Sequence, residues 1–230
     1  MLKILVAEDD VSTNKLLCAI LKINGYEAIP AFNGEAALDI IDHQHIDLLL
    51  CDVMMPKMDG FALTQAIRDG GSMMPILMLT AKALPEDKHT GFLVGTDDYM
   101  TKPFSMRELI ARCKALLRRV ERAKVIAKNS ENEKLLDFGS MVIDPAQRIV
   151  TVNGEQVHLT PTEFDLLATL ARRPKSVLTR EKLLEEVWDW VDASGTRTVD
   201  SHVKALRHKL GADTIRTVHG VGYAFEPPTA

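Results

Sequence analysis

The chain has 230 residues, 46% of them hydrophobic and 26% charged, a composition typical of a globular protein with room for two ordinary domains. Its net charge of −4 excludes a chain that is basic throughout, so any binding of nucleic acid must come from local clusters of charge. No apolar run approaches the ~20 residues that cross a bilayer, and the first residues lack a signal-peptide pattern, so we expect a cytoplasmic protein without a membrane partner.

Residues 1–120 alternate short apolar runs with amphipathic stretches, as strands and helices do in turn. The apolar runs predict five strands, at residues 3–8, 27–32, 46–52, 75–80 and 98–101. The stretches between them predict helices at residues 11–26, 34–44, after Gly60, 86–95 and from Met106 to about Val120. In the first helix we expect one face to point to the core, formed by Leu16, Leu17, Ile20 and Leu21. The alternation predicts an α/β domain with a doubly wound five-stranded parallel sheet.

The rhythm changes after residues 121–134, a polar and charged segment that we interpret as a linker, in part helical. Residues 135–228 predict a smaller α+β domain, which begins with short strands and a hairpin turn at Asn153-Gly154. Its helices are expected at residues 160–173, 179–188 and 197–210. Thr160 and Glu163 have the spacing of a capping box, in which each side chain bonds the other residue's amide. A final hairpin is predicted to turn at His219-Gly220.

Charged and polar residues end several predicted strands of the first domain. Glu8, Asp9 and Asp52 are joined there by Thr80 and Lys102. In a parallel sheet these ends lie at one edge, where ligands bind. Three carboxylates repel one another, so we expect a hard cation with oxygen ligands, such as Mg²⁺. With Lys102 and Thr80 added, the set is suited to hold a phosphoryl group on Asp52.

Four segments carry a family resemblance: ILVAEDD, DLLLCDVMMPKMDG, ILMLTAKA and GTDDYMTKPF resemble, in order and spacing, the receiver domain of two-component response regulators. The resemblance implies a CheY-like (flavodoxin-like) fold in which Asp52 takes a phosphoryl group from a sensor histidine kinase. It implies a Mg²⁺ (or Mn²⁺) site made by Glu8, Asp9, Asp52 and the carbonyl of Met54. It also implies phosphate-binding and switch residues, namely Thr80, Ala81, Tyr99 and Lys102, and a cis bond at Lys102-Pro103.

Two other functions fit part of this pattern. An aspartyl-nucleophile phosphatase would turn over outside substrates, but such enzymes usually place a second Asp two residues after the nucleophile, where this chain has Met54. A regulator that works without phosphorylation would not need the complete acidic site. We therefore expect no enzyme, apart from the receiver's catalysis of its own phosphorylation and dephosphorylation.

The OmpR/PhoB subfamily of response regulators dimerises through charge pairs, and this chain has residues at the matching positions. The resemblance pairs Lys88 with Glu108, Asp98 with Arg112 and Asp97 with Arg119, around an apolar centre. The complete set expected at a homodimer interface is Lys88, Phe92, Asp97, Asp98, Glu108, Ile110, Arg112 and Arg119. A single pair of this kind would be typical of a solvated surface.

The segment 196–210 predicts an amphipathic helix. Val199, Val203, Leu206 and Leu210 share one side, and the opposite side carries Arg197, Ser201, Lys204 and His208. Residues 135–230 contain eleven basic and thirteen acidic residues, so charge alone favours a solvated helix face.

The motifs LTPTEFDLLATLARRPKSVLTREKLLEEVW, RTVDSHVKALRHKL and TVHGVGYAF nevertheless resemble the winged helix-turn-helix domain of OmpR/PhoB regulators. The resemblance makes 196–210 the recognition helix and the last hairpin the wing. The residues that it places at DNA are Arg197, Thr198, Ser201, His202, Lys204, Ala205, Arg207, His208 and His219. Ala205 and His219 depart from basic residues common in relatives. The implied partners are the kinase, promoter DNA with direct-repeat half-sites and, through residues 188–196, RNA polymerase.

Overall fold

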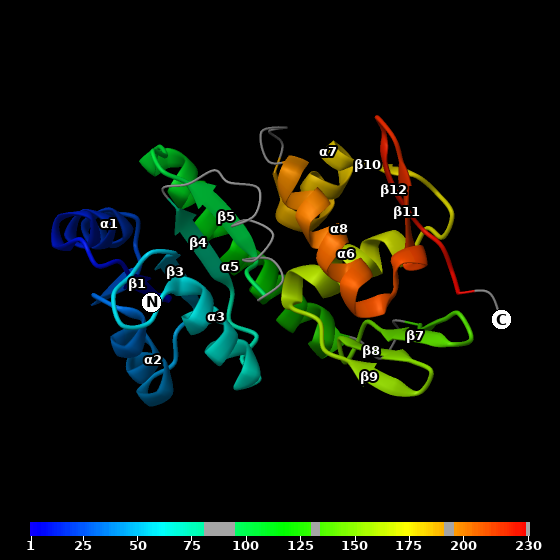
Figure 1. Ribbon diagram of the computed structural model, residues 1–230, viewed down its shortest axis with the longest axis horizontal. Helices are drawn as coiled ribbons and strands as arrows, with labels where there is room; N and C mark the ends of the chain where they lie inside the picture. The colour runs from blue at the N-terminus through cyan, green and yellow to red at the C-terminus, as the bar shows by residue number, and fades with distance from the viewer. Residues whose placement is uncertain (81–94, 130–133, 191–195, 229–230) are drawn as a thin grey trace. The chain divides into compact units, whose positions relative to one another are not determined.

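The structure is a computed structural model that describes residues 1–80, 95–129, 134–190 and 196–228 (Figure 1). It divides into two compact units, Met1–Leu117 and Arg118–Ala230. The helix α5, Met106–Asn129, continues through most of the segment predicted as a linker, so residues 121–129 are helical. The domain limits 1–120 and 135–228 remain predictions.

The first unit is built on a five-stranded parallel sheet in the order β2-β1-β3-β4-β5. The strands are β1 Lys3–Ala7, β2 Glu27–Ala31, β3 Leu48–Asp52, β4 Ile76–Thr80 and β5 Asp98–Thr101. All five residues of β3 and of β4 are buried, as expected for central strands covered on both faces. The predicted doubly wound fold is confirmed.

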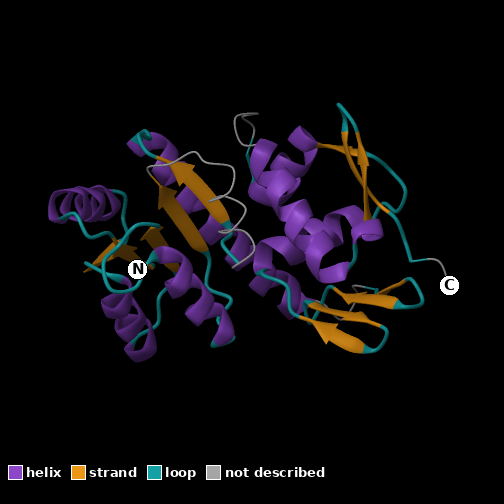
Figure 2. Ribbon diagram, viewed as in Figure 1, coloured by secondary structure: helices purple, strands orange, loops and turns teal. Residues whose placement is uncertain are grey.

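Helices cover both faces of this sheet (Figure 2). They are α1 Val11–Ile23, α2 Gly34–His43, α3 Gly60–Asp69 and α5. Successive strand residues point to opposite faces, so Leu48 and Leu50 pack with α1 and α5, whereas Leu49 and Cys51 pack with α2 and α3. All three cysteines of the chain, Cys18, Cys51 and Cys113, are buried in these two clusters.

The predicted core face of α1 is partly wrong. Leu17 and Leu21 are fully buried, but Leu16 is 52% exposed. The buried row instead runs through Asn14, Leu17, Cys18 and Leu21, which is the spacing of three and four residues along one side of a helix. Leu16 is apolar but lies beside that row, so the periodic pattern assigned it to the wrong side of the helix.

The second unit begins with a four-stranded antiparallel sheet in the order β6-β7-β8-β9. Its strands are β6 Leu136–Asp137, β7 Met141–Asp144, β8 Ile149–Val152 and β9 Glu155–Val157. Asn153 and Gly154 connect β8 to β9 with φ values of 53° and 84°. Two central residues with positive φ are typical of the predicted hairpin turn, which is confirmed.

Helices and a second small sheet complete this unit. The helices are α6 Pro161–Ala171, α7 Arg180–Leu183, a π-helical turn η2 Leu184–Trp188, α8 Thr196–Leu210 and a 3₁₀ turn η4 Ala212–Thr214. The sheet has the order β10-β12-β11, with β10 Leu178–Thr179, β11 Ile215–Val218 and β12 Gly222–Phe225. β11 and β12 form the predicted final hairpin.

Local signals set the ends of these helices. Thr160 and Glu163 form the predicted capping box at the start of α6, with the Thr160 amide donating to the Glu163 carboxylate at 2.7 Å. On α8, Val199, Val203 and Leu206 are fully buried, as predicted, but Ser201, which was predicted on the opposite side, is buried as well.

Within the part of the chain that is described, no helix combines the length and apolarity needed to cross a membrane.

Candidate phosphoacceptor site and DNA-binding surface

The carboxyl edge of the parallel sheet brings the predicted acidic residues together. Glu8 follows β1, and Asp52 is the last residue of β3. One carboxylate oxygen from each of Glu8, Asp9 and Asp52 lies within 4.8 Å of the others. Glu8 and Asp52 are buried, whereas Asp9 is exposed, so the cluster opens to solvent on the Asp9 side.

Lys102 offsets part of the negative charge of this cluster. Its ammonium donates to Glu8 Oε2 at 2.6 Å and to Asp52 Oδ2 at 2.8 Å. Burial raises the pKa of Glu8 above its ordinary value, and the nearby Asp52 adds to this, although the Lys102 hydrogen bond acts in the opposite direction. Burial lowers the pKa of Lys102, but its bonds to Asp52 and Glu8 outweigh that effect and raise it on balance.

The donor set fits a hard divalent cation. All three clustered side chains offer carboxylate oxygens, which are ligands that suit Mg²⁺ and Mn²⁺. One lysine does not neutralise three carboxylates, so a cation is also favoured electrostatically. The side chain of Met54, whose carbonyl is the further predicted ligand, is 71% exposed and lies outside the core.

The predicted switch residues of β4 and β5 are buried in the receiver unit. Thr80 ends β4 and is 2% exposed, and Tyr99 of β5 is 6% exposed within the core on the α2 and α3 side. The Lys102 amide donates to the Thr80 carbonyl at 2.6 Å, and the Lys102-Pro103 bond is cis, as expected. Ala81 lies outside the described residues.

Two residues hold the backbone of this site in place, and only the first of them, Asn14, escaped sequence reasoning. Asn14 of α1 is fully buried, and its amide nitrogen donates to the carbonyls of Val6, Glu8 and Ala31, at 3.2, 3.0 and 2.8 Å. It thereby fixes the segment that carries Glu8 and Asp9. Gly60 starts α3, and a Cβ there would lie 2.4 Å from the Asp52 carbonyl. Its role is therefore close approach to the end of β3.

Replacing Asn14 with alanine should cost about 2 kcal/mol of stability, because three buried carbonyls would lose their shared donor. Asn24 is the matched control, since its amide donates to the Ile20 carbonyl at the exposed end of the same helix. Asn24→Ala should cost under about 0.5 kcal/mol. Urea unfolding followed by far-UV circular dichroism measures both. Equal costs would contradict the role given to Asn14.

The residues predicted for a dimer interface make ion pairs within one chain. Arg112 binds Asp98 at 2.9 Å and Glu108 at 2.6 Å, and Asp97 accepts from Arg68 at 2.9 Å. Ile110 is 8% exposed, in the core with α1. In the second unit, Arg119 contacts the Thr162 hydroxyl and lies 3.5 Å from Asp165. Lys88 and Phe92 lie outside the described residues.

The predicted DNA contacts fall into two groups. Lys204 and His208 of α8 and His219 in the β11–β12 turn are exposed. Four others are at most 9% exposed, namely Thr198, Ser201, His202 and Ala205. The side chain of Arg197 lies outside the described residues.

Contacts within the second unit explain two of the less accessible side chains. His202 is 1% exposed because it packs edge-on against Trp188, with ring centroids 5.1 Å apart and Nδ1 3.0 Å from the Thr198 carbonyl. Arg207 is part-buried and donates to the Ile215 carbonyl and to the Thr217 hydroxyl. The family resemblance places both residues at DNA, and both also have partners inside the protein.

Comparison with known proteins accounts for both units. Residues 4–114 match the family model described as response regulator receiver domain, and residues 154–225 match the model described as transcriptional regulatory protein, C terminal. The chain is 44% identical to the alkaline phosphatase synthesis transcriptional regulatory protein PhoP of Bacillus subtilis, over 98% of this chain and 97% of that protein. It is 41% identical to the DNA-binding response regulator MtrA of Mycolicibacterium smegmatis, over 98% and 97%.

Solved structures agree with this assignment. A mutant of RitR, in which one cysteine is replaced by serine, aligns with a TM-score of 0.76 and 29% identity over 99% of this chain and all of that one. The response regulator DrrB, a Thermotoga maritima OmpR/PhoB homologue, aligns with a TM-score of 0.52 and 33% identity, over 98% and 99% of the two chains. The chain therefore belongs to the OmpR/PhoB family of two-component response regulators, which are transcription regulators with a receiver domain and a DNA-binding domain.

Proposed function

We propose that Asp52 is the phosphoacceptor, and that phosphorylation there by a sensor histidine kinase controls DNA binding by the second unit. The observation that carries the proposal is the approach of Lys102 to Asp52 and Glu8 beside the exposed Asp9. A carboxylate held rigidly at the end of β3, next to a fixed cation, is suited to phosphoryl transfer, which needs positioning and charge neutralisation above all.

In the proposed reaction, an Asp52 oxygen attacks the phosphorus of a phosphohistidine, and the phosphorus–nitrogen bond of the donor breaks. Lys102, now 2.8 Å from Asp52 Oδ2, is within reach of an oxygen of the new phosphoryl group. The Thr80 hydroxyl, at the end of the neighbouring strand, is a second candidate partner. Glu8, Asp9 and Asp52 would hold Mg²⁺ or Mn²⁺, with the Met54 carbonyl as a fourth ligand. Bound there, the metal supplies positive charge against the phosphoryl oxygens.

Treating the full chain with Mg²⁺ and acetyl phosphate tests this assignment by intact-mass spectrometry. The wild-type chain should gain the mass of one phosphoryl group, and Asp52→Asn should gain none. Asp59→Asn is the matched control, because Asp59 caps α3 through the Ala62 amide and asparagine caps equally well. It should gain the phosphoryl group like the wild type. A mass gain that survives in Asp52→Asn, or no gain in any variant, would overturn the proposal.

We further propose that phosphorylation favours a homodimer. In this dimer, the ion pair between Asp98 and Arg112, which now forms within one chain, would form between the two chains. Asp97, now paired with Arg68, would pair with Arg119 across the interface, and Lys88 would pair with Glu108, around Phe92 and Ile110. Light scattering on the same phosphorylated samples should show a mass near twice that of the chain, and no such change in Asp52→Asn.

For DNA binding we propose that α8 enters the major groove of promoter DNA and that the β11–β12 hairpin reaches the minor groove. The exposed Lys204, His208 and His219 are the contacts that support this geometry. Arg197, Thr198, Ser201, His202 and Ala205 remain proposed contacts from the same helix. A dimer would place two such units on direct-repeat half-sites and raise their effective concentration. Residues 188–196 are a proposed contact for RNA polymerase.

Replacing His219 with arginine should tighten binding about three- to tenfold, because an arginine suits the negative potential of a narrow minor groove. The dependence of log affinity on log salt should also steepen by about one. Fluorescence anisotropy measures both, on a duplex recovered by in vitro selection with the wild-type chain. His158→Arg is the control. His158 is exposed between β9 and α6, so this substitution adds the same charge at a site away from the wing. Equal gains in the two variants would contradict a wing contact.

A further inference from the structure

The wing strand β12 is attached to two helices through one buried tyrosine. Tyr223 is 5% exposed, and two guanidinium groups lie over its ring. The Arg180 carbon Cζ is 4.8 Å from the ring centroid and that of Arg207 is 5.8 Å away. Arg180 belongs to α7 and Arg207 to α8. Both distances are within the range of cation–π attraction.

The hydroxyl end of Tyr223 closes a hydrogen-bonded triangle with α7 and α8. It donates to Asp200 Oδ1 at 2.7 Å and accepts from Arg180 Nη2 at 3.1 Å. Arg180 Nε donates to the same Asp200 oxygen at 2.7 Å. Asp200 is a residue of the proposed recognition helix. Hydrogen bonds to a charged group are stronger than those between neutral groups. The triangle, which contains the Asp200 carboxylate and the Arg180 guanidinium, therefore holds α8 to the wing.

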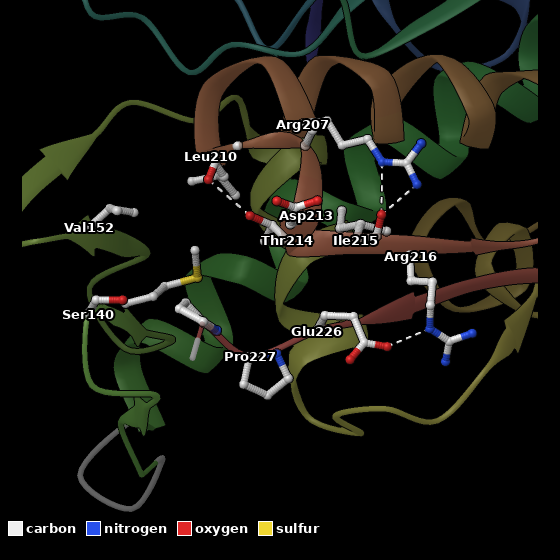
Figure 3. Close-up of a pocket in the computed structure, with 14 residues that line it drawn as sticks. Ser140, Val152, Arg207, Leu210, Asp213, Thr214, Ile215, Arg216, Glu226 and Pro227 are labelled. Atoms are coloured by element: carbon white, nitrogen blue, oxygen red, sulfur yellow. Dashed lines mark hydrogen bonds and ion pairs between the residues drawn. The ribbon is translucent and has the colours of Figure 1, made fainter. Parts of the chain in front are cut away.

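Arg207 makes a second tie, from the far end of α8 to the other wing strand. Its Nε and Nη2 donate to the Ile215 carbonyl at 2.9 and 2.5 Å, and Nη2 also donates to Thr217 Oγ1 at 2.7 Å. Figure 3 shows the guanidinium turned toward Ile215 on β11. The guanidinium is planar and its N–H donors have a fixed geometry. Arg207 makes three hydrogen bonds with these donors, all to partners within the protein.

The strands of the wing are closely packed up to the last pair before the turn. Gly222 pairs with both Thr179 of β10 and Val218 of β11. A Cβ on Gly222 would lie 1.9 Å from the Leu178 carbonyl. His219, in contrast, is exposed in the turn. The position of the tip relative to α8 is therefore set by contacts along the two wing strands, up to Gly222 beside the turn.

We propose that Arg207 and Asp200 are positioning residues, which hold the wing at a fixed angle to α8 so that both reach DNA together. This deepens the proposed function and rests on its wing contact. The alternative for Arg207 is the direct phosphate contact suggested by family position. Holding two binding elements in fixed geometry makes the second contact nearly intramolecular, and loosening the hold reduces that advantage.

Thr217→Val separates the two roles of Arg207. It removes the hydroxyl that Arg207 binds, keeps the shape and changes no charge. Binding to the selected duplex should weaken about five- to tenfold, with an unchanged salt slope, whereas loss of a phosphate contact lowers the slope by about one. Thr151→Val, the same change on β8 of the other sheet, should bind like the wild type. Arg207→Lys keeps the charge without the fork and should weaken binding like Thr217→Val.

A double-mutant cycle of Thr217→Val with His219→Ala measures whether the two substitutions affect DNA affinity independently. A loss of folding would not produce such a coupling. His219→Ala should cost several-fold in affinity in the wild-type background and much less in Thr217→Val. Hydroxyl-radical footprints of Thr217→Val should lose protection in the minor groove, while dimethyl sulfate footprints keep protection in the major groove. Tyr223→Phe, which removes the bond to Asp200, should behave in the same way.

The outcomes distinguish this proposal from the one it rests on. Two outcomes would overturn the positioning role alone. One is that the effects of Thr217→Val and His219→Ala are additive. The other is that Thr217→Val binds like the wild type while Arg207→Gln has a flatter salt slope. No effect of His219→Ala in the wild type would show that the wing does not contact DNA, and would overturn both.

Discussion

Replacing Gly222 with alanine should destabilise the second unit by about 3 kcal/mol or more, the upper part of the range for forcing atoms into a filled space. The new methyl group would lie 1.9 Å from the Leu178 carbonyl and 2.9 Å from the Thr179 Cα. Both are backbone atoms, which cannot rotate away as a side chain does. β12 would have to separate from β10, which would also displace Tyr223 from the arginines over it.

Gly220→Ala provides the control for this variant. Gly220 lies in the same hairpin with φ 73°, and a Cβ added there would have nothing within 4 Å, so alanine meets strain but no clash and should cost about 1 kcal/mol. The only two tryptophans of the chain, Trp188 and Trp190, belong to the second unit. Tryptophan fluorescence during urea unfolding therefore reports that unit separately. A Gly222→Ala midpoint no lower than that of Gly220→Ala would refute the packing argument.

Lys102→Met should destabilise the receiver by about 3 kcal/mol at neutral pH, because it leaves two buried carboxylates without their cation. Glu8 would lose the hydrogen bond that holds its pKa down, so its folded-state pKa should rise further. An acid with a raised folded-state pKa stabilises the fold when it is protonated. The deficit should therefore shrink as the pH falls through that raised pKa. Added Mg²⁺ should also recover part of the loss.

Thermal unfolding followed by far-UV circular dichroism, with and without Mg²⁺ and across the acidic range, measures this effect. Lys57→Met is the matched control, since Lys57 is 61% exposed and lies 3.8 Å from a similarly exposed Glu35. Exposed pairs contribute at most about 1 kcal/mol. A Lys102→Met loss that is the same at every pH, or no larger than that of Lys57→Met, would show that the cluster is not electrostatically strained.

Periodicity was sufficient to predict the receiver fold. Buried strands such as β3 and β4 are continuous apolar runs, and each ends on a residue of the proposed site, Asp52 or Thr80. Periodicity was less reliable on α1, where Leu16 is apolar yet exposed. The buried row of that helix contains a polar residue, Asn14, whose three bonds are all to backbone carbonyls. Backbone partners have no signature in the sequence, which is why Asn14 was missed.

The exposure of the proposed DNA-binding residues was predicted less completely than the grouping of the acidic residues, for a related reason. The helix pattern separated Lys204 and His208 from the core side correctly, but it could not foresee Arg207 bonding to β11. Nor could it foresee that His202 packs against Trp188. A charged or aromatic side chain at the border of two helix faces can point either way. Only the position of β11 and η2, set by contacts distant in sequence, decides its direction.

The buried cysteines have a chemical consequence for signalling. Thiols react with peroxides as thiolates, and burial raises the pKa of Cys113 to about 12 and that of Cys51 further still. Both thiols therefore stay protonated, and both are buried away from solvent. This holds for Cys51 although it is adjacent to the proposed phosphoacceptor. The thiol beside the proposed phosphoacceptor is therefore poorly placed to react with peroxides, which would keep signalling through Asp52 independent of redox conditions.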